Sequence, residues 1–341
     1  MAGVDPHMRL SVLDLVPVRT DQSTSNALAA STQLAQTADR LGFTRYWLAE
    51  HHNLPSVASP APEIMIGQIA AATKRIRVGS GGVMLPNHAP LVVAERFKTL
   101  EALFPGRIDL GLGRAPGTDQ LTAFALRRLQ EPRGGDDFLE RLQELIFWDR
   151  GFPEGHPFRP IAAMPSDAPL PPIWLLGSSD YGGRLAAQIG VGFAFAHHFA
   201  SVDAVAVMRL YRDGYNREGF QAEPYAILAV AVVCADTDAE AERLASSMDL
   251  NWLRREHGEY APLPSPEEAA AHPYSEADRA RIARNRARLF VGAPATVREK
   301  LSAMIAASGA DEVMVTSAIY DHEARKRSYA LLAKEFGLAS A

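Results

Sequence analysis

Short apolar segments alternate with longer segments of helical periodicity along almost all of the 341 residues, and this alternation restricts the fold more than any other feature. It is the pattern of parallel strands joined by crossover helices. Strands are expected at 10–18, 45–52, 76–85, 107–114, 172–179, 192–199, 226–235 and 311–319. Helices are expected near 24–41, 60–73, 90–104, 136–150, 180–190, 203–218, 238–256 and 323–336. Eight such units, with no break in composition between two halves, favour an α/β fold of the (β/α)8 barrel type over an open doubly wound sheet.

Two stretches are longer than the connections that a minimal (β/α)8 barrel needs. Residues 151–171 are rich in proline and polar residues and predict a long loop before strand 5, and residues 257–290 predict an insertion between strands 7 and 8 that contains a charged helix. Long loops are often functional, so we expect both to build the substrate pocket. Residues 1–8 are expected to be an N-terminal extension, with 1–7 left from an expression vector, and residues 9–341 to form one domain.

Composition excludes several classes of protein. A formal net charge of −5 provides no basic field for a nucleic acid. The single cysteine, Cys234, excludes an intrachain disulfide or a cysteine-based metal site and fits a reducing cytoplasm. The most apolar segment, 225–235, is too short for the ~20 residues that span a bilayer. We therefore expect a cytoplasmic protein with neither nucleic acid nor membrane as partner.

Polar residues gather at the predicted carboxyl ends of the strands, where the active site of a barrel lies. The segment "LAEHHNLP" (48–55) places Glu50, His51 and His52 together at the end of strand 2. Adjacent strand residues point to opposite faces, so the two histidines are not expected to share an ion, and we expect no metal site. His51 is the acid/base candidate, with a hydrogen bond to loop backbone as the alternative, and His52 is expected to be structural.

Two further strand ends favour a phosphorylated ligand. The glycines of "RIDLGLGRAPGTD" do not match a dinucleotide-binding fingerprint, but Arg114 is suited to a phosphate or carboxylate, with a surface ion pair as the alternative. In "LLGSSDYGG", Gly177, Ser178 and Ser179 form a turn before a helix. Such a turn either binds an anion or only caps the helix.

The segment "VGSGGVMLPNHAP" places Ser80, Gly81 and Gly82 in a predicted strand. Glycine weakens a strand, so its presence predicts a close approach to the backbone. A flat aromatic ring lying against residues 80–82 would account for it, and a simple bulge is the alternative.

At these residues the chain resembles the bacterial luciferase-like flavin monooxygenases. "WLAEHHN" and the run "RVGSGGVMLPNHAPLVVAERFKTLEALFPGRIDLGLGRAPGTD" are similar to that family from strand 2 through strand 4. "WLLGSSDYGGRLAAQIGVGFAFAHHF" and "GADEVMVTSAIYDHEARKRSYALLA" are similar to its alkanal monooxygenase-like branch. The resemblance covers roughly residues 9–335. It implies a homodimeric barrel that binds FMN at its carboxyl-terminal mouth. Reduced FMN, commonly supplied by a separate flavin reductase, and dioxygen would oxygenate a small aldehyde-like or other apolar substrate.

The resemblance also implies roles for particular residues. His51 matches a catalytic histidine, and Ser80, Gly81 and Gly82 match a strand with a cis peptide, here between Gly81 and Gly82. The remaining cofactor-binding matches are Glu50, Met84, Arg114, Gly177, Ser178, Ser179 and Tyr181. His197 and His198 are candidates for the substrate pocket, and which of them faces inward is left open.

The chain departs from the family pattern at Gly177, and two other functions remain as alternatives. Luciferase itself has a glutamate at the position of Gly177, so light emission is not implied. A deazaflavin-dependent dehydrogenase of the same superfamily and a non-enzymatic flavin-binding protein are the alternatives. No NAD(P)H fingerprint is visible, which is consistent with a partner reductase.

Overall fold

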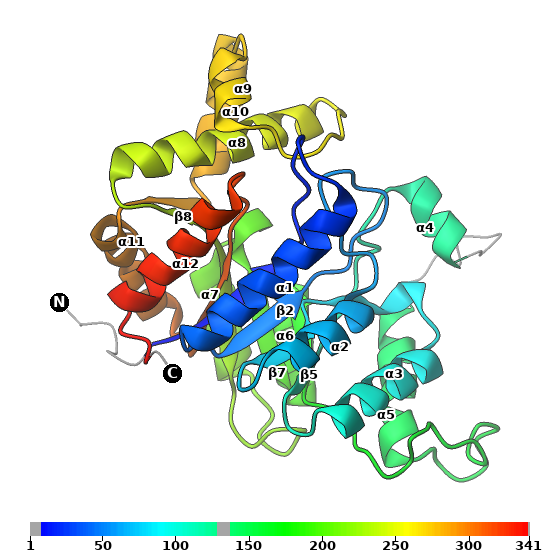
Figure 1. Ribbon diagram of the computed structural model, residues 1–341. Coiled ribbons are helices and arrows are strands. Elements are labelled where there is room, and N and C mark those ends of the chain that lie inside the picture. Colours follow the sequence, from blue (N-terminus) through cyan, green and yellow to red (C-terminus); the bar gives the residue numbers. More distant parts are fainter. Residues whose placement is uncertain (1–7, 128–136, 340–341) are drawn as a thin grey trace.

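The computed structural model describes residues 8–127 and 137–339, and eight parallel strand positions within them close into a barrel (Figure 1). The strands are β1 (Arg9–Asp14), β2 (Arg45–Leu48), β3 (Arg77–Ser80) continued by β4 (Val83–Met84), β5 (Ile108–Gly113), β6 (Ile173–Gly177), β7 (Gly192–Ala196), β8 (Ala226–Cys234) and β10 (Glu312–Thr316). β10 pairs with both β8 and β1, which closes the ring. The predicted (β/α)8 barrel is confirmed.

Helices surround the barrel because each parallel strand needs a crossover to reach the next. The outer ring consists of α1 (Thr24–Arg40), α2 (Pro62–Ala72), α3 (Pro90–Leu103), α5 (Phe138–Arg150), α6 (Asp180–Ile189), α7 (Ala204–Asp213), α11 (Pro294–Ser308) and α12 (His322–Glu335). Shorter elements are α4 (Gln120–Arg127), η1 (Leu85–Asn87) and η2 (His197–Phe199). Of the predicted N-terminal extension, only Met8 is within the described residues, and it is buried in the core. No described helix has both the length and the apolar character needed to cross a bilayer.

The segment between β8 and β10 differs from the prediction. The expected barrel helix α8 (Asp238–Glu256) instead lies across one end of the barrel, below α9 (Pro266–Ala271) and α10 (Glu276–Arg286) (Figure 1). β9 (Leu289–Gly292) pairs with the second half of β8, and α11 packs against α7 and α12 in the outer ring. β9 was not predicted, because four residues after a charged helix carry too little periodicity to reveal a strand.

Residues 151–171 form the predicted irregular loop, without a helix or strand. Phe152 packs against Trp148 of α5 with the ring centroids 4.6 Å apart, and its ring also stacks on that of His156. The loop therefore lies on the outer helical layer.

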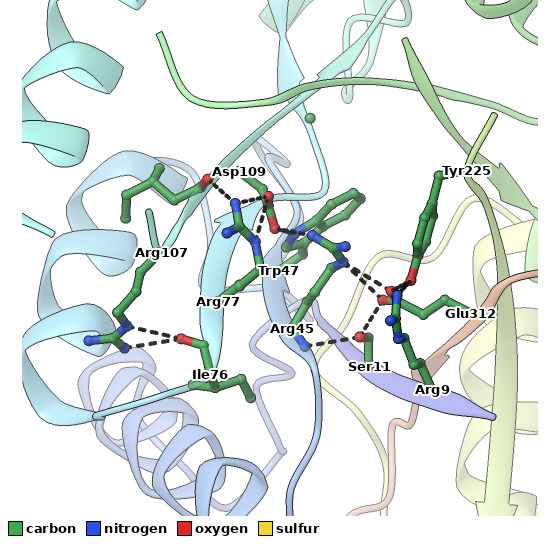
Figure 2. Close-up of polar contacts among 12 residues, drawn as sticks. Arg9, Ser11, Arg45, Trp47, Ile76, Arg77, Arg107, Asp109, Tyr225 and Glu312 are labelled. Carbon is green, nitrogen blue, oxygen red and sulfur yellow. Dashed lines mark hydrogen bonds and ion pairs between the residues drawn. The ribbon is translucent and has the colours of Figure 1, made fainter. Parts of the chain in front are cut away.

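The amino-terminal end of the barrel interior is closed by buried charges (Figure 2). Arg45 Nη1 donates to Asp109 Oδ2 at 2.8 Å, and its Nε donates to Glu312 Oε2 at 3.1 Å. Arg77 also binds Asp109, at 2.6 Å, and Tyr225 donates its hydroxyl hydrogen to Glu312 at 2.7 Å. Both carboxylates are fully buried. Burial opposes the charge of Arg45, but the two carboxylates raise its pKa above the ordinary value.

An Arg45→Met variant tests this arrangement. The change leaves two buried carboxylates short of a counter-ion, so we expect the free energy of unfolding to fall by about 3–5 kcal/mol. Equilibrium unfolding in urea measures the difference. Arg217→Gln is the matched control, because Arg217 pairs with Glu223 on the surface and its loss should change stability little. A change for Arg45→Met as small as that of the control would show that the network does not stabilise the barrel.

Candidate active site

A cavity of about 590 Å³ opens at the carboxyl ends of the barrel strands, beneath α8. This volume lies in the range of small-molecule sites, roughly 300–1,000 Å³. Most of its lining is apolar or glycine. The predicted residues that line it are His51, Gly81, Gly82, Met84, Arg114, Gly177, Ser178, Ser179, Tyr181 and His198. These predicted residues come from five separate segments of the sequence, which the fold brings to one space.

His51 follows β2, and both its main chain and its ring lie within hydrogen-bond distance of backbone carbonyl groups. Its N–H donates to the carbonyl of Ser59 at 3.0 Å, and its ring Nδ1 lies 3.2 Å from the carbonyl oxygen of Gly117. Burial lowers the pKa of His51, and the charge of Arg255 lowers it further. The neutral ring must carry its proton on Nδ1 to donate to a carbonyl, so Nε2 keeps a lone pair for the cavity.

The two glycines between β3 and β4 are required by the protein's own packing. The peptide bond between Gly81 and Gly82 is cis, as the resemblance implies. A Cβ on Gly81 would lie 2.6 Å from the Leu13 side chain, and one on Gly82 would lie 2.8 Å from the Gly111 carbonyl oxygen. Neighbouring strands therefore account for both glycines without a ligand. Both residues nevertheless line the cavity.

A group of residues suited to binding an anion lies on one side of the cavity. The guanidinium of Arg114, at the end of β5, lies 4.2 Å from the ring centroid of Tyr181. Ser178 and Ser179 precede α6, and the side chain of Ser179 makes no capping hydrogen bond. The first N–H groups of a helix have no intrahelical partner and favour an anion. A cation, two hydroxyls and a helix amino terminus thus converge at this turn.

Three predicted residues lie outside the cavity lining: Glu50, Ser80 and His197. Ser80 is buried between β3 and β5, where its hydroxyl binds both the N–H and the carbonyl of Gly111. The ring nitrogens of His197 are buried without a partner among the described residues, while His198 reaches the cavity. The structure therefore does not place these three residues in the cavity lining, and their expected contact with a ligand stays a prediction. Burial lowers the pKa of His198 to about 4, so its ring is neutral at pH 7.

Glu50 organises the loops behind the cavity. Its fully buried carboxylate accepts hydrogen bonds from the Met84 N–H at 2.8 Å, from His52 at 2.8 Å and from His88 at 3.0 Å. Asn87 adds a weaker bond at 3.3 Å. Burial raises the pKa of Glu50, but the bonds from His88, His52 and Met84 lower it below its ordinary value of 4.5. His52 thus has the structural role that the sequence predicts.

The segments expected to build the pocket contribute little. No described residue of 151–171 lines the cavity, and 257–290 contributes only Leu263. The covering face comes instead from α8, through Met248, Asn251, Trp252 and Arg255. Their spacing of three and four residues places them on one face of the helix. In the sequence, the signal for this face was that the polar residues Asn251 and Arg255 share it with the apolar Met248 and Trp252.

No cluster of histidine, cysteine and carboxylate side chains that could hold a metal ion occurs in residues 8–127 and 137–339.

A Glu50→Gln variant tests the role of the buried carboxylate. An amide keeps the size but loses the charge and one acceptor, so we expect a loss of about 2–4 kcal/mol in unfolding free energy at pH 7. The stabilisation by ionised Glu50 is complete above its unfolded-state pKa and is lost as the pH falls through the lower folded-state pKa. The difference between wild type and variant should stay constant above about pH 5 and shrink toward pH 3.

Urea unfolding at a series of pH values measures that difference. Glu223→Gln is the control, because the Glu223 side chain is 73% exposed. A difference for Glu50→Gln that does not change with pH would contradict the assigned role.

Comparisons with known proteins match this architecture. The family model described as luciferase-like monooxygenase covers residues 8–312. A luciferase-like monooxygenase of Escherichia coli (strain K12) is 42% identical over 328 residues, which are 96% of each chain. The crystal structure of apo-MsnO8 has a TM-score of 0.89 at 40% identity and covers 98% of this chain and 100% of the other.

More distant structures share the fold with different cofactors. The oxygenating constituent of 3,6-diketocamphane monooxygenase from Pseudomonas putida, in complex with FMN, has a TM-score of 0.71 at 21% identity, covering 96% and 97% of the two chains. An F420-dependent secondary alcohol dehydrogenase has a TM-score of 0.70 at 12% identity, covering 96% and 99%. At these identities the likeness concerns the fold. The family match and the 42% identity over nearly the full length show that this chain belongs to the luciferase-like monooxygenase family.

Proposed function

We propose that this protein is an FMN-dependent monooxygenase that uses reduced flavin and dioxygen to oxygenate a small organic substrate. One observation carries the proposal: a single apolar cavity holds both an anion-binding turn and a histidine with an available ring nitrogen. Membership of the luciferase-like monooxygenase family supports the reaction class.

The residues present fit FMN. Arg114, Ser178 and Ser179, with the first N–H groups of α6, would hold the phosphate. Gly81 and Gly82 present backbone without side chains to the cavity, which suits a flat ring. Met84 follows them and offers a polarisable apolar contact.

Reduced FMN, when bound, supplies the electrons that activate dioxygen for transfer of one oxygen atom to the substrate. The chain itself would bind the phosphate, hold the ring against Gly81 and Gly82, and exclude water through the apolar lining. His51 would accept or return a proton at Nε2, because its Nδ1 proton is fixed by the Gly117 carbonyl. Glu50 would act only through the loops that it holds.

The proposal also specifies which cofactor the protein binds and which partners it has. A deazaflavin is the rival cofactor and would indicate hydride transfer without dioxygen. Titration of the flavin-free protein with FMN and with F420, followed by fluorescence, separates the two. We also propose a homodimer and a separate flavin reductase, as the resemblance implies, and a cytoplasmic location, which the single cysteine favours. Light scattering coupled to gel filtration tests the dimer.

An Arg114→Gln variant tests the phosphate site. Removal of a charged hydrogen-bond donor should weaken FMN binding by roughly tenfold to a hundredfold. Riboflavin, which lacks the phosphate, should bind wild type and variant alike. Arg184→Gln is the control, because Arg184 lies on α6 but pairs with Asp180 outside the cavity. Equal losses for FMN and riboflavin would contradict the assignment of Arg114 to the phosphate.

A His51→Ala variant tests the acid/base role. General acid/base groups typically contribute roughly 10²–10⁴ in rate, so substrate-dependent oxygen consumption should fall at least about a hundredfold while FMN affinity stays unchanged. The assay would use a panel of aldehydes, ketones and thioethers with reduced FMN. His257→Ala, a change at the surface, is the control. Retained oxygenation by His51→Ala would refute the role, and wild type inactive on every compound would favour a flavin-binding protein without catalysis.

A further inference from the structure

We propose that the substrate carries a carboxylate, which Arg255 of α8 binds with help from Asn251 one turn earlier. This inference rests on the proposed function, because it assigns Arg114 to the phosphate of FMN and leaves Arg255 for the substrate. It adds a charged end to a substrate that the sequence analysis expected to be apolar.

The first observation is the environment of Arg255. Its side chain lines the cavity, and within the described part of the chain its guanidinium has no hydrogen bond, ion pair or aromatic contact. The adjacent Arg254 is paired with Glu268 at 2.7 Å, and Arg286 of α10 is paired with Asp249 of α8 at 2.7 Å. Among the described residues, Arg255 therefore has no counter-ion, unlike Arg254 and Arg286.

The second observation is the charge of the cavity as a whole. Its described lining includes two arginines, Arg114 and Arg255, and no aspartate, glutamate or lysine. The complete chain has a formal net charge of −5, so this accumulation of positive charge is local. A guanidinium beside a largely apolar cavity attracts anions and strengthens their binding. Two guanidiniums on different elements fit two separate anionic groups.

The third observation is where Arg255 lies. Asn251 and Arg255 are one helical turn apart and both line the cavity, so an amide and a guanidinium donate into the same space. Met248 and Trp252 lie on the same face of α8 and provide apolar contact. The positive charge of Arg255 also contributes to the lowered pKa of His51. A carboxylate at Arg255 would therefore leave the apolar part of the substrate between α8 and the barrel mouth, near His51.

Calorimetric titration of the full-length protein with hexanoate and with hexanamide, in the presence and absence of FMN, tests the inference. The two probes have the same chain, and only hexanoate is charged. We expect wild type to bind hexanoate about tenfold or more tightly than hexanamide. Arg255→Gln should abolish this preference, and Arg255→Lys should keep part of it. Arg254→Gln is the matched control, because it removes an adjacent charge that is already paired.

The possible outcomes separate the two proposals. Equal binding of both probes by wild type, or an unchanged preference in Arg255→Gln, overturns the inference. A loss of FMN affinity in Arg255→Gln would also overturn it, because Arg255 would then belong to the cofactor. If wild type does not bind FMN but the flavin-free protein still prefers hexanoate, the proposed function is wrong. The carboxylate site at Arg255 would still be supported in that case.

Discussion

The closed barrel depends on one buried guanidinium at its amino-terminal end. Arg45 of β2 reaches Asp109 of β5 and Glu312 of β10, so a single side chain joins strands from different sides of the ring. Such a group stabilises only while all its partners are present, because each carboxylate is fully buried and would otherwise be an unpaired buried charge. Charges thus fill one end of the barrel, and the other end is free to form a cavity.

Another buried carboxylate, that of Glu50, performs the corresponding task at the cavity end. Glu50 comes from the end of β2, yet its hydrogen bonds reach β4, η1 and His88. It thereby fixes the loops beside His51 and stays out of the cavity itself. Glu50 therefore joins the loop segments that lie beside the site.

The cavity differs in charge from the protein that surrounds it. The chain is acidic overall, whereas the described lining contains two arginines and two neutral histidines. A neutral imidazole can accept a proton, and the arginines can bind anions. This combination suits a reaction that needs a phosphate-bearing cofactor, an apolar space and a proton carrier together.

The sequence determined the barrel, because alternation of buried strands and helices over eight units is a local pattern repeated many times. It also indicated His51, Arg114 and the turn at Ser178 and Ser179, because strand ends of a barrel meet at one mouth. Only the tertiary structure decided that Glu50 and Ser80 are internal and that His198, not His197, reaches the cavity. It alone placed α8 across the mouth. Which face of a segment meets the cavity depends on packing between elements distant in sequence, and no local pattern encodes it.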